Sequence, residues 1–363
     1  MTENGQILIG PIVARSIKYL AMNAIVCDMT AWMYFAFSPL TTPIPAHQAR
    51  EKVLQASGSA ACARAIRSAG WWRGSEALAR SVLALPPARE VPVHFLRAAA
   101  QREGARINTV VHQMSYEVPS GFLYEIQPPL GLDSLQIVGP EGYALLRARE
   151  VDEIHLAILL SLLCGQYLCM PHNGSVVYRK KAMTSMSAIE TMSNQLTPTT
   201  RGIKRLKSVL PFVADKAYSP METVIQLALC LPQKWGGCGL PIPQLNARIE
   251  VQGEHSYILG GSREIHPDGL WSSVHLGYEY DSHQEHDTNT EQIEKDRRRR
   301  DVMERLGYTM VVFDRATCRD ELRRNLAFER ITHFLGYPFD WGSTAQLRRR
   351  TLWARLMTKD LCW

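Results

Sequence analysis

The spacing of apolar positions in the first half of the chain changes from helical to strand-like. Residues 46–80 are rich in alanine and follow a helical spacing, whereas 106–113, 121–126 and 135–138 are short and rich in β-branched and aromatic residues. The most apolar segment, 154–170, contains polar residues and is shorter than the roughly 20 residues that a spanning helix needs. We therefore expect an N-terminal region that is mostly helical α+β, with 154–170 as a buried helix.

Three other segments before residue 210 have weaker patterns. Residues 91–104 are expected to form a short helix that begins after Val91 and Pro92. Residues 184–200 are rich in Ser, Thr and Met and are expected to form a loop or linker. The basic segment 201–209 is a candidate short helix.

The second half of the chain has the pattern of a small α/β unit. Ser219, Pro220 and Glu222 stand at the N-cap, the first and the third positions of an expected helix, a sequence typical of a capping box. Gly307 ends a second, longer helix. The expected elements are a helix at 219–231, strands at 247–251, 257–259 and 274–281, a helix at 290–306 and a strand at 308–313.

This succession divides the chain into three parts. Residues 1–210 form an N-terminal α+β region, residues 211–340 a compact α/β domain with a central mixed sheet flanked by helices, and residues 341–363 a basic tail. Pro211, which interrupts the pattern just before a clear helix start, supports the first boundary. The fold class expected from sequence is therefore α/β.

Charge is unevenly distributed along the chain. The net charge is +6, and the segment from Arg315 to the end has ten Arg or Lys against five acidic residues, which gives +5 for that segment alone. A positive segment of this kind can follow a phosphate backbone, although it can equally be the solvated face of a helix. DNA is the partner that this charge favours.

The cysteines and the apolar segments indicate the compartment. The eight cysteines are scattered and form no Cys-x-x-Cys pair, a pattern typical of reduced, mostly buried thiols. The N-terminus lacks a basic segment of the kind that opens an export signal, and no segment is long enough to span a membrane. We expect a cytoplasmic protein with no membrane partner.

Carboxylates near one strand of the α/β domain are the strongest chemical signal. Glu279 and Asp281 lie two residues apart on the expected strand 274–281, so they leave the same face of the sheet, and Asp268 precedes that strand. Acids on an apolar strand must be hydrated, paired or bound to a metal, and Mg²⁺ or Mn²⁺ prefers such oxygen ligands. The alternatives are a catalytic centre, a fold that has lost catalysis, and unrelated acids on a solvent face.

These motifs resemble the PD-(D/E)XK restriction-endonuclease-like superfamily, and within it the domains related to very-short-patch-repair nucleases. The resemblance covers about 120 residues. It rests on Pro267–Asp268, on Glu279-x-Asp281, on an Asp-x-x-Arg helix segment beginning at Asp296, and on Leu306–Gly307 before an apolar strand. It implies a Mg²⁺-dependent endonuclease in which Asp268 and Glu279 bind the metal.

The resemblance also assigns roles to further residues and exposes one departure. It implies that Glu222, from the leading helix, and Asp281 complete the metal site. Asp281 stands where the superfamily has Lys, so the general base implied by the short-patch-repair group is His286. His266 and Glu264 have no role that the sequence supports.

The helix 290–306 is expected to provide both a structural ion pair and contacts to DNA. Asp296 lies on the apolar stripe of this helix and therefore faces the sheet, where Arg299 or Arg300 can neutralise it. A catalytic role for Asp296 is the alternative. The residues expected to contact phosphates are Lys295, Arg297, Arg298, Arg299 and Arg300 of this helix, and Arg348, Arg349 and Arg350 of the tail.

A second, fainter resemblance offers a rival function. Leu163–Cys164–Gly165–Gln166–Tyr167 resembles the segment that joins an AbiEi-antitoxin-like region to such a nuclease domain in bacterial proteins. It implies a non-catalytic DNA-binding regulator or antitoxin. A third possibility is a protein-interaction module that retains vestigial acids.

Overall fold

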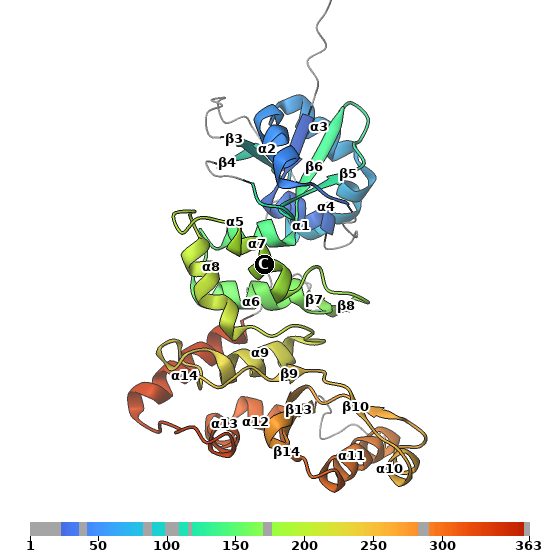
Figure 1. Cartoon of the computed structure of the whole chain (residues 1–363), viewed down its shortest axis with the longest axis vertical. Coiled ribbons are helices and arrows are strands. Elements are labelled where there is room, and N and C mark those ends of the chain that lie inside the picture. Colours follow the sequence, from blue (N-terminus) through green and yellow to red (C-terminus); the bar gives the residue numbers. More distant parts are fainter. Residues whose placement is uncertain are drawn as a thin grey trace, which may run out of the picture.

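A computed structural model of the chain describes residues 23–35, 42–82, 89–98, 109–114, 118–169, 176–281 and 290–358. These residues form a mixed α/β structure that consists of three units stacked along the long axis, shown from top to bottom in Figure 1. A sheet with helices forms the top, a helical layer the middle, and a second sheet with helices the bottom.

A six-stranded mixed sheet organises the N-terminal unit, with strand order β2-β5-β6-β1-β3-β4. The parallel pairs are β1 with β6 and β3 with β4, and the other neighbours are antiparallel. The strands are β1 (Asn23–Val26), β2 (Thr42–Pro43), β3 (Val93–Ala98), β4 (Thr109–Met114), β5 (Leu123–Ile126) and β6 (Ser134–Val138), and the helices are α1 (Asp28–Phe35), α2 (Ala46–Gln55), α3 (Ala60–Ser68) and α4 (Gly70–Val82).

The expected helix at 91–104 is wrong, because Val93–Ala98 is the strand β3. This strand lies between β1 and β4, and five of its six residues are buried. A short, almost continuous apolar segment suits a buried helix and a central strand equally well, so only the neighbouring strands decide between them.

A helical layer follows, and it includes one segment that was expected to be a loop. Its elements are α5 (Pro140–Arg147), α6 (Glu153–Cys164), β7 (Tyr167–Cys169), β8 (Val176–Tyr178), α7 (Met186–Asn194), α8 (Ile203–Val209) and the 3-10 turn η1 (Leu210–Phe212). The helix α7 lies within the expected loop 184–200. Ser185 caps α7 by accepting a hydrogen bond from the N–H of Ala188, and Ile189, Met192 and Ser193 are buried on one face.

The C-terminal unit is built on a four-stranded sheet of order β14-β13-β12-β9. The strands β9, β12 and β13 are successively antiparallel, and β14 is parallel to β13. Connecting two parallel neighbours requires a crossover, and α11 is that crossover. The elements are α9 (Pro220–Cys230), η2 (Gln233–Trp235), β9 (Gln244–Leu245), β12 (Gly269–Trp271), η3 (Ser272–Val274), β13 (Leu276–Asp281), α11 (Thr290–Arg305) and β14 (Thr309–Asp314).

A small subdomain is inserted between β9 and β12. It consists of the two-stranded pair β10 (Ile249–Glu250) and β11 (Glu264–Ile265), with the short helix α10 (Glu254–Ile258) between them. Its apolar residues Val251 and Ile265 pack with Val302 and Met303 of α11 in a small core of their own. The expected strand at 257–259 is therefore wrong, and the first part of that segment ends α10.

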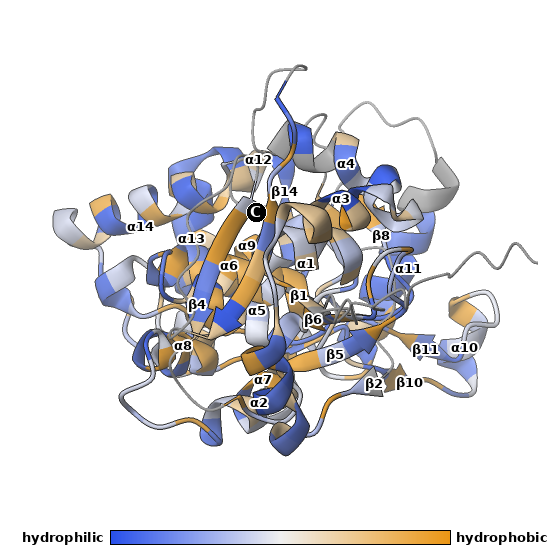
Figure 2. Cartoon of the chain, turned by 90° about the horizontal axis from the view of Figure 1, so that it is seen from above, coloured by the Kyte–Doolittle hydropathy of each residue, from blue (hydrophilic) through white to orange (hydrophobic). Residues whose placement is uncertain are grey.

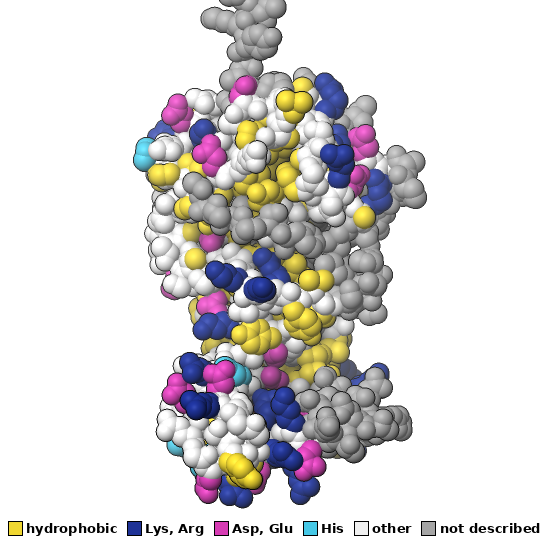
Figure 3. Space-filling view, turned by 90° about the vertical axis from the view of Figure 1, so that its right-hand side faces the viewer, with side chains coloured by type: hydrophobic (Ala, Val, Ile, Leu, Met, Phe, Trp, Pro, Cys, Tyr) yellow, Lys and Arg dark blue, Asp and Glu magenta, His cyan; other side chains and the backbone are white. Residues whose placement is uncertain are grey.

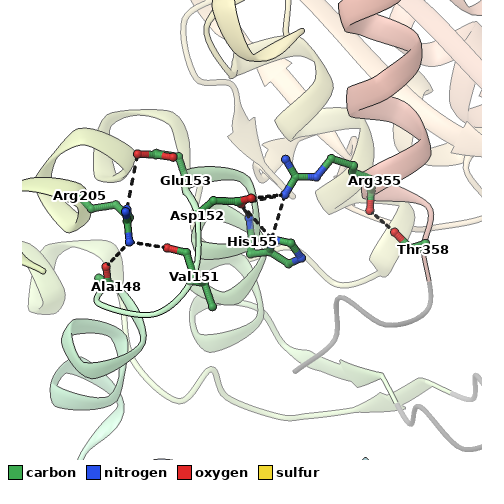
Figure 4. Close-up of polar contacts among 8 residues, drawn as sticks. All are labelled: Ala148, Val151, Asp152, Glu153, His155, Arg205, Arg355 and Thr358. Carbon is green, nitrogen blue, oxygen red and sulfur yellow. Dashed lines mark hydrogen bonds and ion pairs between the residues drawn. The ribbon is translucent and has the colours of Figure 1, made fainter.

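The segment expected to be a basic tail contains a packed helix. After α12 (Arg315–Arg319) and α13 (Glu321–Phe334), the helix α14 (Ser343–Leu356) buries Leu352, Trp353 and Leu356. Figure 4 shows how α14 is joined to the helical layer: both Asp152 carboxylate oxygens accept hydrogen bonds from Arg355 Nη2, at 2.8 and 2.7 Å. The main apolar core includes residues from all three units.

Hydropathy follows this layered arrangement. In Figure 2 the peripheral helices α2 and α11 are mostly polar, whereas α6 in the middle layer consists mostly of apolar residues. Ten of the twelve α6 residues are buried, as the composition of 154–170 predicted, but the helix ends at Cys164 and the end of that segment forms the strand β7. Within the described part of the chain, no helix is long and apolar enough to cross a membrane.

The contact between Asp152 and Arg355 provides a test of how the units are held together. Burial raises the pKa of Asp152, but hydrogen bonds from His155 and the guanidinium of Arg355 together lower it to about 2. We expect Asp152→Asn, which keeps the N-cap of α6, to lower the free energy of unfolding by about 0.5 kcal/mol, and Asp152→Ala by about 1.5 kcal/mol. Urea denaturation measures both.

The pH dependence of this contact has a defined direction. Because the pKa in the folded protein lies below the ordinary value of 3.8, the stabilisation is complete above about pH 4 and is lost as pH falls towards 2. Asp152→Asn should therefore differ from the wild type at pH 6 and match it near pH 2. Equal destabilisation at both pH values would contradict the ionic contribution.

Candidate functional site

The start of α9 fixes the position of Glu222. The Ser219 Oγ accepts a hydrogen bond from the Glu222 N–H at 3.2 Å, and Glu222 Oε2 accepts one from the Tyr218 N–H at 2.8 Å. The first bond is the Ser219 N-cap expected from the sequence, whereas the Glu222 carboxylate bonds back to the residue before the N-cap, a variant of the expected capping box. Oε2 also accepts a hydrogen bond from Asn246 Nδ2 at 2.7 Å. Glu222 is therefore a buried carboxylate held by donors from two segments.

Asp268 lies directly before β12, across from Glu279. The antiparallel register pairs Gly269 with Tyr278, and continuing it by one residue sets Asp268 opposite Glu279. The Tyr280 N–H donates to Asp268 Oδ2 at 2.6 Å. A Cβ at Gly269 would lie 2.1 Å from the ring of Tyr278, so a glycine at this position makes room for that ring over β12.

The electrostatic environment of Asp268 is the most perturbed at the site. Burial raises its pKa, the negative charge of Glu222 raises it further, and Glu279 adds to both effects. The N–H of Tyr280 and the cation of Arg299 oppose these effects only in part, so the pKa is about 7. Three carboxylates from α9, from the start of β12 and from β13 therefore interact electrostatically.

The acids of β13 face α11, and each lies beside an arginine of that helix. Arg299 Nη2 donates to Glu279 Oε1 at 2.9 Å, and Arg300 Nη2 lies 4.0 Å from Asp281 Oδ2. Burial raises the pKa of Glu279, and the two arginines oppose that shift. The opposite face of the strand carries Tyr278, which is fully buried.

Arg299 also contacts Asp296. Its Nη1 lies 3.9 Å from Asp296 Oδ1, and its Nη2 donates to the backbone carbonyl of His266 at 3.1 Å. Only 18% of the Asp296 side chain is exposed, so it faces the sheet as its position on the apolar stripe predicts. Arg299 thus joins α11 to β13 and to the segment before Asp268.

The structure describes the acids of the predicted metal centre but not its predicted general base. His286 lies outside the described residues. Among the residues that are described, no three His, Cys, Asp or Glu side chains have the spacing of a metal site.

An open groove of about 720 Å³ lies between α11 and the inserted subdomain. None of Glu222, Asp268, Glu279 and Asp281 lines it, but Arg299, which does, is bonded to Glu279. Its walls include Glu294, Lys295, Arg298 and Arg299 on one side and Ser262, Glu264 and His266 on the other. Figure 3 shows Lys and Arg side chains interspersed with acidic ones on this face of the C-terminal unit. Arg297 is exposed but does not line the groove.

The three predicted arginines of the C-terminal segment differ in their surroundings. Arg349 is buried, stacks on the ring of Phe339, and donates to Asn325 Oδ1 at 3.2 Å. Arg350 is exposed and donates to both carboxylate oxygens of Glu321. Arg348 is exposed. These buried contacts indicate that Arg349 stabilises α14. Its role therefore differs from that of the arginines that line the groove.

Two residues at the site were not predicted. Asn246 adopts a φ of 51° and holds both Glu222 and the carbonyl of Lys216, another residue with positive φ. His266 Nδ1 lies 3.3 Å from the Asn246 carbonyl, and its Nε2 lies 3.4 Å from Glu264. His266 could have been predicted as a site residue because it lies two residues before Asp268. The sequence around Asn246 gives no such indication.

Comparison of the chain with protein-family models, with curated proteins and with solved structures found no match.

Proposed function

We propose that residues 211–340 form a restriction-endonuclease-like domain and that the chain is a metal-dependent endonuclease that hydrolyses phosphodiester bonds in DNA. The observation that carries the proposal is the electrostatic coupling of Asp268 to Glu222 and Glu279, together with Arg299, which connects Glu279 to a groove that Lys295 and Arg298 also line. Perturbed carboxylates next to an open groove are typical of functional sites.

The connectivity of the C-terminal unit supports the same fold. Without the inserted subdomain, the order is helix α9, antiparallel strands β9, β12 and β13, helix α11, and the strand β14 parallel to β13. This is the order on which the sequence resemblance depends. The three acids come from the first helix, the start of the second strand and the third strand.

The chemistry of these carboxylates suits a hard divalent cation, whereas the described side chains do not have the spacing of a formed metal site. Asp268 and Glu279 would bind Mg²⁺ or Mn²⁺ through carboxylate oxygens, with Glu222 and Asp281 completing the site. The raised pKa of Asp268 reflects its burial first and then the negative charges of Glu222 and Glu279, which Arg299 balances only in part. When bound, such an ion activates a water and stabilises the charge that develops on the phosphate.

The remaining residues of the site position the substrate. Lys295 and Arg298 line the groove and would bind the phosphate backbone, with Arg297 and Arg300 beside them on α11. The Tyr280 N–H fixes the orientation of the Asp268 carboxylate. His286 stays the predicted general base.

A non-catalytic DNA-binding regulator or AbiEi-like antitoxin is the second candidate. The specific observation in its favour is that both acids of β13 already have arginines beside them, with Asp281 in the position of the expected Lys. Pairing of this kind stabilises a fold without any need for a metal. The two candidates make the same prediction for DNA binding and opposite predictions for cleavage.

Nicking of supercoiled plasmid distinguishes the two candidates. We expect the wild-type protein to convert supercoiled plasmid to open circles with Mg²⁺ or Mn²⁺, and to leave it intact with EDTA. DNA binding is measured on the same protein by fluorescence anisotropy. Binding without cleavage under either metal would overturn the enzyme and support the regulator, and loss of both would overturn both.

A further inference from the structure

Arg299 lies between the carboxylates and the groove. Its Nη2 donates to Glu279 Oε1 at 2.9 Å, and the same side chain lines the groove with Lys295 and Arg298. About one third of the Arg299 side chain is exposed, compared with 15% for Glu279. One guanidinium therefore contacts a proposed metal ligand and is also accessible to an anion in the groove.

The contacts of Arg299 come from the two terminal nitrogens of its guanidinium. A guanidinium has five N–H donors in a planar fork. Nη2 is bonded to Glu279 and to the carbonyl of His266, and Nη1 is at ion-pairing distance from Asp296. A phosphate matches the fork geometry well and accepts two hydrogen bonds at once, so it can compete with Glu279, to which Arg299 donates only one.

We propose that Arg299 is an internal counter-ion that occupies Glu279 until a substrate phosphate draws it into the groove. This inference rests on the proposed metal-dependent function and adds a linkage to it. Arg299 and a divalent cation compete for the carboxylate of Glu279. A phosphate that binds Arg299 therefore raises the affinity for the cation, and the cation raises the affinity for DNA by the same factor.

A purely structural role for Arg299 makes a different prediction. If the ion pair only attaches α11 to the sheet, its removal loosens the site and weakens cation binding. If Arg299 competes with the cation, its removal frees Glu279 and strengthens cation binding. The sign of the change in affinity therefore separates the two roles.

Binding of Mn²⁺ alone tests the proposal without cleavage. Free Mn²⁺ is followed by electron paramagnetic resonance during titration of the full-length protein. We expect Arg299→Gln to bind Mn²⁺ about 10-fold more tightly than the wild type. Arg299→Lys, which keeps the charge but loses the planar fork, should lie between them and serves as the second variant if the Gln variant does not fold.

Arg305→Gln is the matched control, because Arg305 is on the same helix and pairs with Asp301 at 3.0 Å, away from the groove. Its Mn²⁺ affinity should stay within about 2-fold of the wild type. A circular dichroism melt establishes that each variant is folded. Unchanged or weaker Mn²⁺ binding by folded Arg299 variants would overturn the counter-ion role alone, and absence of Mn²⁺ binding from every protein would overturn the metal-dependent function as well.

The linkage has its own measurement. The affinity for a short DNA duplex is measured by anisotropy with EDTA and with Mn²⁺, under conditions in which a gel shows the duplex intact. In the wild type, Mn²⁺ should strengthen DNA binding, and in Arg299→Gln the gain should be smaller. An equal gain in both proteins would contradict the competition.

Discussion

Replacing Asp268 with Asn is expected to abolish metal-dependent cleavage and, at the same time, to stabilise the fold above neutral pH. Asn is close to Asp in shape, and its amide oxygen can still accept the hydrogen bond from the Tyr280 N–H. It cannot supply a negatively charged ligand. We expect a loss of cleavage of about 1,000-fold, equivalent to about 4 kcal/mol of transition-state stabilisation.

The gain in stability follows from the raised pKa of Asp268. The pKa is about 7 in the folded protein and has an ordinary value of 3.8, so between these values the folded protein holds a proton that the unfolded chain releases. The wild-type fold therefore loses stability as pH rises from about 4 to 7. The Asn variant has no such loss, so its advantage should be near zero at pH 4 and about 2 kcal/mol above pH 7.

Two measurements check this prediction on the same variant. Plasmid nicking measures activity, and urea denaturation with EDTA at pH 4.5 and pH 8 measures stability without a bound metal. Asp301→Asn is the matched control, because Asp301 is an exposed acid on α11 paired with Arg305, and neither quantity should change. An Asp268→Asn protein that still cuts, or one that is less stable than the wild type at pH 8, would contradict the assignment.

Replacing Gly269 with Ala is expected to have the largest effect on stability, about 3 kcal/mol of destabilisation. The new Cβ would lie 2.1 Å from Tyr278 Cε1, and Tyr278 is fully buried among Trp271 and Phe313. The ring cannot move away without disturbing that packing. Because Gly269 follows Asp268, the displacement should also reduce cleavage.

Gly74→Ala provides the control for the chemistry of the substitution. Gly74 lies within α4, and a Cβ there would meet nothing within 4 Å. Alanine favours helix over glycine, so this variant should be as stable as the wild type or slightly more so. Urea denaturation of both variants measures the difference, and a Gly269→Ala protein of wild-type stability would contradict the packing of the Tyr278 ring over Gly269.

The local sequence correctly predicted those features that depend on interactions between residues close together in the chain. The Ser-Pro-x-Glu pattern predicted the start of α9, and the alternation along β13 placed Glu279 and Asp281 on the face opposite Tyr278. The stripe on α11 placed Asp296 towards the sheet. In each case the deciding interaction lies within a few residues, so the pattern contains the information.

Elements that depend on distant partners were predicted less well. Val93–Ala98 looked helical, yet it is a strand because β1 and β4 lie on its two sides. The segment that ends α10 looked like a strand, yet it is a short helix in a subdomain that packs on α11. A short apolar segment carries no record of which neighbours will cover it.

The sequence by itself determined which acids could form a site, and the tertiary structure decided which of them share one. Asp268 and Glu279 were visible as candidates, but their coupling to Glu222 depends on the packing of α9, which Asn246 joins to the sheet. Four consecutive arginines, 297–300, could have paired with Glu279. Arg299 is the one that donates to it, because the packing of α11 against β13 brings that side chain to the acid. Contacts between residues far apart in the chain arise from packing, and no local spacing specifies them.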